Sequence, residues 1–180
     1  MPRKPREDVA GAVQHVFARG NDRREIWVDD ADRATYLVLL GRVTERCRWR
    51  CLSYCLMPNH VHLLLETPLP NLGVGMQRLQ SQYAQIFNER HGRTGHLFQG
   101  RYGSVRITSD EQLWGVVTYI AVNPVRAGLC RRPEHWRWSS HAHMLAGRPA
   151  PGWLDFAHLL GYFDGPGGEP HNRYTGHDRG

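Results

Sequence analysis

The sequence of 180 residues predicts an α+β fold, in which an antiparallel sheet carries helices packed on one face. Three observations indicate this class. Short apolar runs of strand length alternate with longer stretches that have apolar residues at helical spacing. Two of the predicted strands follow each other with only a tight turn between them. A hydrophobic content of 41% is ordinary for one soluble domain with a buried core.

The predicted elements follow one another in the order β-α-β-β-α-β-α. In chain order they are a strand at 11–19, a helix at 30–47, strands at 50–57 and 60–66, a helix at 73–91, a strand at 104–108, a helix at 110–123 and a short helix at 138–145. The first strand ends where Gly20 and Asn21 favour a turn. Pro58 separates the second and third strands, because proline cannot donate to a sheet ladder.

The second half of the chain completes a recognisable topology. The glycine-rich segment 92–103 predicts a loop before the fourth strand. Asp110 is a suitable N-cap for the third long helix, which we expect to end at Asn123 because Pro124 disfavours helical geometry just before it. Along the chain, one helix separates the first strand from the second, and another separates the third strand from the fourth. The second and third strands follow each other directly. This order matches the split β-α-β arrangement of ferredoxin-like folds.

Composition limits the domain organisation and the partners. We expect one domain over residues 1–163 and a flexible polar tail over 164–180. The formal charge of +6 favours a polyanionic partner, although a merely basic protein is the alternative. No apolar stretch approaches the roughly 20 residues of a membrane span, and the N-terminus lacks a signal-peptide core. The expected protein is therefore cytoplasmic, contacts no membrane, and is a monomer or a homodimer.

The four cysteines, Cys47, Cys51, Cys55 and Cys130, include no Cys-x-x-Cys pair. A chain of this size with this apolar content does not need a disulfide framework. Cys51 and Cys55 lie in one predicted strand and are expected to share a face. Buried, inert thiols are favoured over a zinc site.

The most informative motif is a pair of histidines at the start of an apolar strand. A strand points residues i and i+2 to the same face, so His60 and His62 lie side by side. Neutral imidazole is a common metal ligand, and two of them on a rigid strand form a possible metal site. Taken alone, such a pair is more often two buried, hydrogen-bonded histidines.

A second pair of residues supplies what such a site lacks. Tyr119 and Asn123 are four apart in a predicted helix and therefore share a face. If that face lies over the histidines, Asn123 adds an amide oxygen as a third ligand and the Tyr119 hydroxyl lies beside the metal. Two nitrogens and an amide oxygen suit Mg²⁺ or Mn²⁺, which would polarise a phosphodiester for attack by the tyrosine. A phenol with a pKa near 10 needs such activation.

Two further patterns are weaker candidates. His141 and His143 repeat the spacing, but in a predicted helix residues two apart point to different faces, so they are rejected as a ligand pair. Tyr83 is a second possible nucleophile, but its helix neighbour Phe87 indicates a packed apolar face.

Four segments together resemble a known family: MPNHVHLLL, GHLFQGRYGSVRI, YIAVNPVRAGL and WRWSS. They resemble the single-tyrosine HUH transposases, and are most similar to the branch called REP-associated tyrosine transposases. Carried over by position, the family's metal-binding residues fall on His60, His62 and Asn123, and its nucleophile falls on Tyr119. The resemblance implies cleavage of single-stranded DNA through a 5′-phosphotyrosine intermediate with a free 3′-hydroxyl. It also implies recognition of imperfect palindromic hairpins.

A DNA-binding role draws attention to exposed cations and to the loop 92–103. In that loop His96 and Phe98 could stack on unpaired bases while arginines hold phosphates, although a purely structural loop at the sheet edge is the alternative. The residues predicted to contact DNA are Arg19, Arg23, Arg93, His96, Phe98, Arg101 and Arg106. The remaining functional alternative is a hairpin-binding DNA or RNA regulator that does not cut. No P-loop pattern occurs, which argues against an ATP-driven enzyme.

Overall fold

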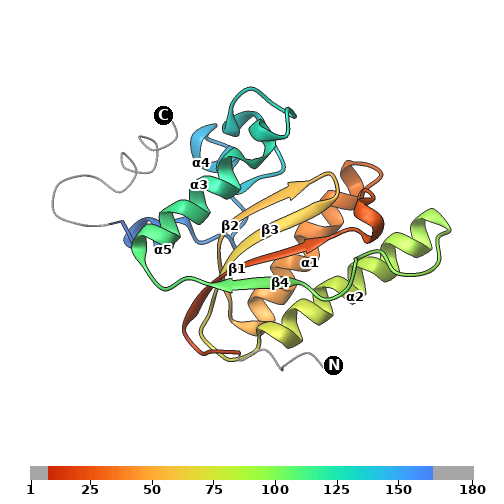
Figure 1. Ribbon diagram of the computed structural model, residues 1–180, viewed down its shortest axis with the longest axis horizontal. Helices are drawn as coiled ribbons and strands as arrows, with labels where there is room; N and C mark the ends of the chain where they lie inside the picture. The colour runs from red at the N-terminus through yellow and green to blue at the C-terminus, as the bar shows by residue number, and fades with distance from the viewer. Residues whose placement is uncertain (1–7, 164–180) are drawn as a thin grey trace.

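The computed structural model describes residues 8–163, which fold into a four-stranded sheet with helices on both sides (Figure 1). In chain order the elements are β1 (Ala12–Arg19), η1 (Asn21–Arg23), α1 (Asp30–Cys47), β2 (Arg50–Met57), β3 (His60–Thr67), α2 (Leu72–His91), β4 (Gly103–Arg106), α3 (Asp110–Arg126), η2 (Pro133–His135), α4 (Ser140–Leu145) and α5 (Phe156–Gly161). The tail expected at 164–180 lies outside the described residues.

The sheet has the strand order β2-β3-β1-β4, and all neighbouring strands are antiparallel. β3 lies between β1 and β2, which is the split β-α-β arrangement predicted from the sequence. The register places Arg19 opposite His60 and Phe17 opposite His62. The α+β class and the antiparallel sheet are therefore confirmed.

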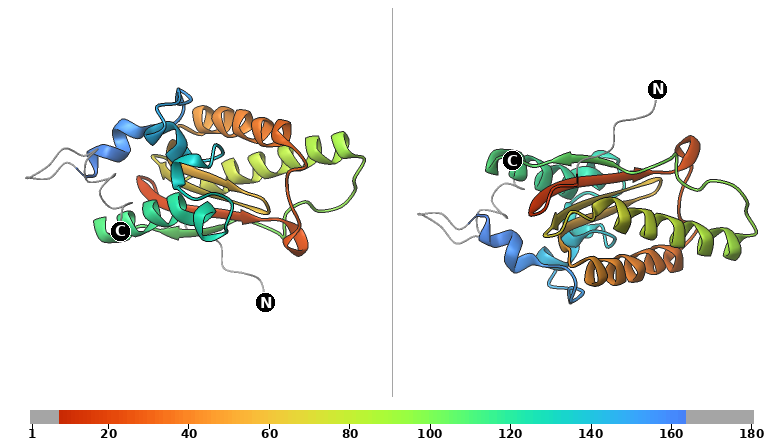
Figure 2. Two further views of the ribbon diagram at one scale, coloured as in Figure 1. Left: turned by 90° about the horizontal axis from the view of Figure 1, so that it is seen from above. Right: turned by 90° about the horizontal axis from the view of Figure 1, so that it is seen from below.

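Helices cover both faces of the sheet, as the two views of Figure 2 show. α1 and α2 pack on one face over residues such as Val16 and Leu63, whereas α3 and α5 pack on the other over Leu64 and Cys55. The expectation of helices on one face is thus wrong for α3 and α5. The physical reason is that β2 and β3 are buried on both sides, as nearly continuous apolar strands usually are.

A β-bulge in β2 changes the expected placement of two cysteines. The pairing with β3 shifts register between Cys51 and Ser53, so one extra residue enters β2. Cys51 consequently packs in the core under α1 and α2, and Cys55 packs in the core under α3. The prediction that they share a face is wrong. Burial raises the pKa of both thiols, which favours their protonated, unreactive form.

α3 begins and ends differently from the prediction. Its N-cap is Ser109, whose hydroxyl accepts a hydrogen bond of 3.1 Å from the Gln112 N–H, and not Asp110. The helix continues past Pro124 to Arg126, because a proline in the last turn removes only one hydrogen bond. The Ala127 N–H donates to the Asn123 carbonyl at 3.0 Å and closes that turn. α5 was not predicted, and α4 starts at Ser140 instead of residue 138.

Candidate active site between the sheet and helix α3

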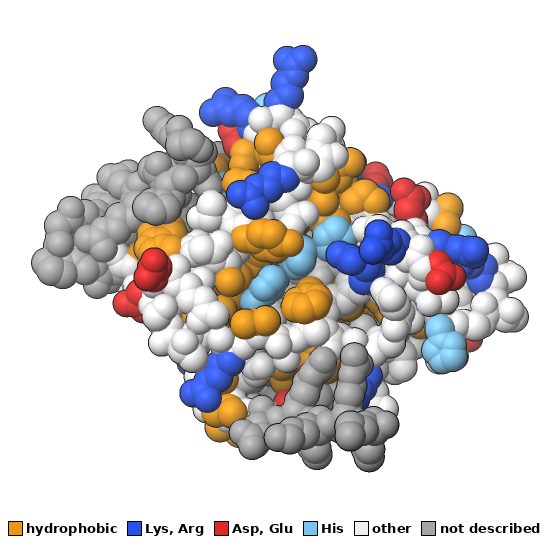
Figure 3. Space-filling view, in the orientation of Figure 1, with side chains coloured by type: hydrophobic (Ala, Val, Ile, Leu, Met, Phe, Trp, Pro, Cys, Tyr) orange, Lys and Arg blue, Asp and Glu red, His pale blue; other side chains and the backbone are white. Residues whose placement is uncertain are grey.

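The two motif histidines lie on the face of the sheet that α3 partly covers. His60 and His62 project from β3 with their ring centroids 4.9 Å apart. The antiparallel register brings the alternate residues of β1 to the same face, namely His15, Phe17 and Arg19. Figure 3 looks at this face: histidine side chains lie in a row, with hydrophobic side chains beside them and basic ones near one end.

α3 carries the other two predicted residues to the same place. Leu113, Val117 and Ile120 form a buried stripe that holds the helix on the sheet. The ring of Tyr119, next to this stripe, lies with its centroid 5.2 Å from that of His62, and its side chain is 38% exposed. One turn later on the same face of α3 lies Asn123, and, against the larger lowering by burial, its side chain is close enough to His60 to raise the pKa of that imidazole. The structure therefore brings together the four residues that the sequence placed in one site.

The electrostatics of the site keep its imidazoles neutral. Burial, and secondarily repulsion from the protonated forms of His60 and His15 and from Arg19, lower the pKa of His62 to about 3. Burial also lowers the pKa of His60 and of His15. At neutral pH all three rings are uncharged, which is the form of histidine that binds a metal ion.

Hydrogen bonds to neighbouring side chains occupy Nδ1 of each motif histidine. The Asn59 side-chain amide donates to the Arg23 carbonyl at 2.9 Å, so its oxygen faces His60 Nδ1 at 2.6 Å. An amide oxygen only accepts, so Nδ1 of neutral His60 carries the proton and Nε2 keeps its lone pair. His62 Nδ1 lies 3.0 Å from His15 Nε2, while His62 Nε2 is buried with no hydrogen-bond partner among the described residues.

A buried polar atom without a partner is rare in folded proteins and is costly unless something satisfies it. A divalent ion held by two imidazole nitrogens and the Asn123 oxygen would do so, with positions left for water or phosphate. Within residues 8–163 no group of three or more His, Cys, Asp or Glu side chains could hold a metal ion. Two imidazole nitrogens with one amide oxygen are a donor set that fits Mg²⁺ or Mn²⁺.

His15 is a site residue that the sequence analysis missed. Its ring centroid lies 5.1 Å from that of His62 and 5.9 Å from that of Tyr119, and its side chain is half-buried between them. The alternation of β1 carried the signal, because His15 shares a face with Arg19. Its Nε2 lies 3.0 Å from His62 Nδ1, so the His15 ring is the hydrogen-bond partner that orients the His62 ring.

The predicted DNA-contacting cations divide between the two sides of the sheet. Arg19 is exposed on the histidine face, opposite His60, and Arg23 is exposed in η1 beside Asn59. Arg106 is also exposed, but it is in register with Gln14, on the face toward α2. Of these three predicted cations, Arg19 and Arg23 lie on the side of the candidate site.

The loop after α2 holds the other predicted residues. Its exposed His96 and Arg101 line a hollow of about 810 Å³ against α2, and Arg93 lies over the Phe87 ring at 5.5 Å. Phe98 is only 7% exposed and packs against the ring of Tyr83 in the core. A ring buried in this way cannot stack on a base, so the role predicted for Phe98 is wrong.

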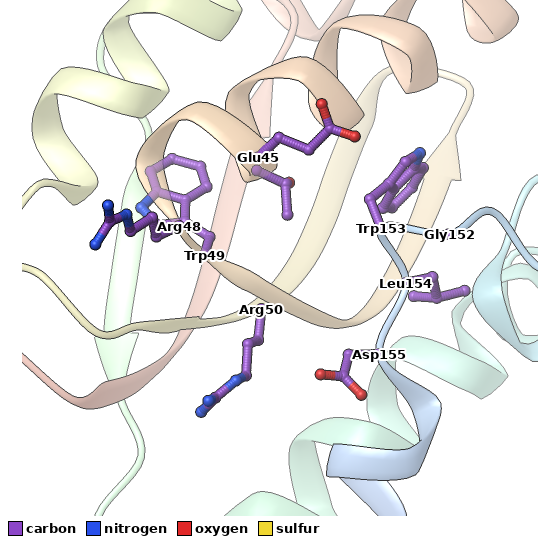
Figure 4. A pocket seen from close by; sticks show the side chains of 9 residues that line it. Glu45, Arg48, Trp49, Arg50, Gly152, Trp153, Leu154 and Asp155 are labelled. Atoms are coloured by element: carbon purple, nitrogen blue, oxygen red, sulfur yellow. The ribbon is translucent and has the colours of Figure 1, made fainter.

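A smaller hollow and the weaker candidates have structural surroundings. A hollow of about 530 Å³ lies between the end of α1, the start of β2 and residues 152–155, and no predicted site residue lines it. Figure 4 shows the side chains that line this hollow. His143 lies in α4 and hydrogen-bonds the Tyr54 hydroxyl at 3.0 Å, and His141 is buried in the same helix. The buried Tyr83 hydroxyl donates to the Ile26 carbonyl at 2.5 Å, which makes it unavailable as a nucleophile.

Comparison with known proteins assigns the family. The sequence model of the IS200-like transposases matches residues 8–123, and the chain therefore belongs to the IS200-like transposase family. It is similar, at 25% identity over 107 residues, to a protein of Haemophilus influenzae that is named as a REP-associated tyrosine transposase. That match covers 53% of this chain and 61% of the relative. The resemblance inferred from the four motif segments is thereby confirmed.

A solved structure supports the fold. The structure of a REP-associated tyrosine transposase bound to a REP hairpin is similar to this one with a TM-score of 0.69 and 18% identity, and the match covers 87% of this chain and 96% of that one. At this identity the likeness shows the shared fold. Among the described residues, no helix is both long enough and apolar enough to cross a membrane.

Proposed function

We propose that this transposase-family chain nicks and rejoins single-stranded DNA beside a hairpin, with Tyr119 as nucleophile and a divalent ion held by His60, His62 and Asn123. One observation carries the proposal. A partly exposed tyrosine lies 5.2 Å, between ring centroids, from a buried neutral histidine whose Nε2 has no hydrogen-bond partner in the described part of the chain. This combination suits a metal-assisted attack by a phenol.

The proposed step exchanges one phosphoester bond for another. The Tyr119 hydroxyl oxygen attacks the phosphorus of the DNA backbone and loses its proton to solvent. The new bond joins this oxygen to phosphorus, while the bond from phosphorus to the 3′ oxygen breaks and that oxygen gains a proton. The products are a 5′-phosphotyrosine and a free 3′-hydroxyl. Because the phosphotyrosine link keeps the energy of the phosphoester bond that was broken, the 3′-hydroxyl of another strand can attack it and rejoin the DNA without ATP.

The residues around Tyr119 have separate tasks in this proposal. His60 and His62 offer Nε2 to the ion, and Asn123 offers its amide oxygen. In this proposal His15 Nε2, 3.0 Å away, accepts a hydrogen bond from His62 Nδ1–H, which leaves the lone pair of His62 Nε2 free for the ion. When bound, the ion neutralises charge on the phosphate and lowers the barrier to attack by a weakly acidic phenol.

The proposed substrate follows from charge and from the family. The formal charge of +6 and the exposed Arg19 and Arg23 near the site favour a phosphate backbone. A similar fold occurs in a protein whose structure was solved with a REP hairpin. We therefore propose hairpin DNA with a single-stranded extension as the substrate, and Mg²⁺ or Mn²⁺ as the cofactor.

The proposal is tested with labelled hairpin oligonucleotides, taken from repeats near the gene, and a denaturing gel. The wild type should form a protein-linked DNA band that requires Mn²⁺ or Mg²⁺. His62→Ala and Asn123→Ala should lose the band but bind the hairpin within about threefold of wild type, since phosphate contacts dominate affinity. Tight binding by the wild type with no linked band under any ion would replace this proposal with a non-cutting hairpin-binding protein.

A further inference from the structure

We propose that Phe17 is a stacking platform for one unpaired base of the DNA strand that passes the active site. This inference rests on the proposed function, because it needs a single strand to cross the histidine face. Stacking of bases on exposed aromatic side chains is a general, sequence-tolerant way to hold single strands. Neither the motif segments nor the predicted DNA-binding residues include Phe17.

The position of Phe17 places it beside the proposed chemistry. It lies directly opposite His62 in the β1–β3 ladder, with a ring centroid 6.4 Å from that of His62 and 5.6 Å from that of His15. Its side chain is nevertheless 39% exposed, although it is an apolar ring in the middle of a sheet. A base stacked on this ring would belong to a nucleotide adjacent to the phosphate that Tyr119 attacks.

The opposite strand is built to hold this ring across the sheet. Phe17 is in register with Gly103 of β4, and a Cβ on Gly103 would lie only 2.1 Å from Cε2 of the Phe17 ring. Any other residue at position 103 would therefore push the ring away. Shielding of a strand glycine by an aromatic ring stabilises a sheet by itself, but it requires no exposed ring surface.

The surroundings match a nucleotide better than a protein partner. Val105, two residues beyond Gly103 and on the same face, is 46% exposed and extends the apolar surface. Arg19, two residues beyond Phe17 on the same face, is exposed and supplies a positive charge for a phosphate. An apolar ring with a cation two residues away on the same face complements a base and its backbone. Figure 3 shows hydrophobic and basic side chains together beside the row of histidines on this face.

The test uses the full chain in the Tyr119→Phe background, so that the bound strand stays intact. Hairpin oligonucleotides carry a single-stranded extension in which 2-aminopurine replaces one base at a time, and stacking is followed by the loss of its fluorescence. With Phe17 present, one position should be strongly quenched. Phe17→Leu should abolish that quenching and weaken binding of the extended hairpin about tenfold, with no change for the hairpin without extension. Phe17→Trp should retain both properties.

Leu69→Ala is the matched control, because Leu69 is 45% exposed after β3, at the opposite end of that strand from His60. It should behave as the parent protein, and thermal unfolding should show that all variants are folded. Quenching and affinity that are unchanged in Phe17→Leu would overturn the platform. The fluorescence experiment needs no cleavage, so its result can be told apart from that of the nicking proposal. The nicking proposal fails if the wild-type protein forms no linked product through Tyr119.

Discussion

Replacing His15 with phenylalanine removes one hydrogen bond from the active site and keeps a ring of similar size. The bond lost is the 3.0 Å contact between His15 Nε2 and His62 Nδ1. Without it, the buried His62 has no acceptor for Nδ1–H and is free to carry its proton on Nε2, where the metal is proposed to bind. An unsatisfied buried donor costs about 1–3 kcal/mol, so the affinity for metal should fall about 5- to 150-fold.

The assay is a titration of Mn²⁺ against the initial rate of DNA–protein linkage. In His15→Phe the metal concentration at half-maximal rate should rise within that range, while the rate at saturating metal stays within a few-fold of wild type. His15→Gln keeps a side-chain acceptor and should recover part of the affinity. The same half-maximal concentration in His15→Phe and wild type would refute the positioning role. So would a lower saturating rate with an unchanged metal dependence.

Three predictions concern stability. A Cβ on Gly75 of α2 would lie 2.1 Å from the Trp49 ring, so Gly75→Ala should lower the free energy of unfolding by about 1–3 kcal/mol. A Cβ on Gly115 of α3 would have no atom within 4 Å, so Gly115→Ala should raise the free energy of unfolding by about 0.5–1 kcal/mol. Urea unfolding measures this free energy for both glycine variants. Burial opposes ionisation of Asp32, but hydrogen bonds, including one from Arg90, lower its pKa below 3.8 in the folded state. This lowered pKa stabilises the fold above pH 3.8, and the stabilisation is lost as the pH falls through the folded value. Arg90→Gln should therefore be less stable at neutral pH and lose less stability on acidification, which urea unfolding between about pH 6 and pH 2 measures; an unchanged pH profile would contradict this.

Local signals were sufficient for most of the fold. Alternating and apolar runs placed β1, β2 and β3 within a residue or two, because each strand is a short run of alternating or apolar residues that ends at a turn. The end of α3 was misjudged because Pro124 lies in the last turn, where its missing N–H costs little. α5 has only six residues, and a helix that short has little periodicity of its own.

In the site, too, local spacing was informative and long-range packing could not be predicted. His60 with His62, and Tyr119 with Asn123, share faces through local geometry, so their spacing was informative. The roles of more distant residues depended on long-range packing. Phe98 reads as an exposed loop aromatic, yet its loop folds back onto α2 and buries it. The 3.0 Å contact between His15 and His62 could not be predicted from the sequence, because it depends on the register between β1 and β3.

The central claim, that Tyr119 is the nucleophile of a DNA transposase site, is tested most directly by locating the covalent bond. The wild-type protein is incubated with the hairpin oligonucleotide and Mn²⁺, the DNA is trimmed by nuclease, and tryptic peptides are analysed by mass spectrometry. A nucleotide attached through its 5′-phosphate to Tyr119 is the predicted result. A nucleotide on any other residue, or linked product that persists in Tyr119→Phe, would contradict the account.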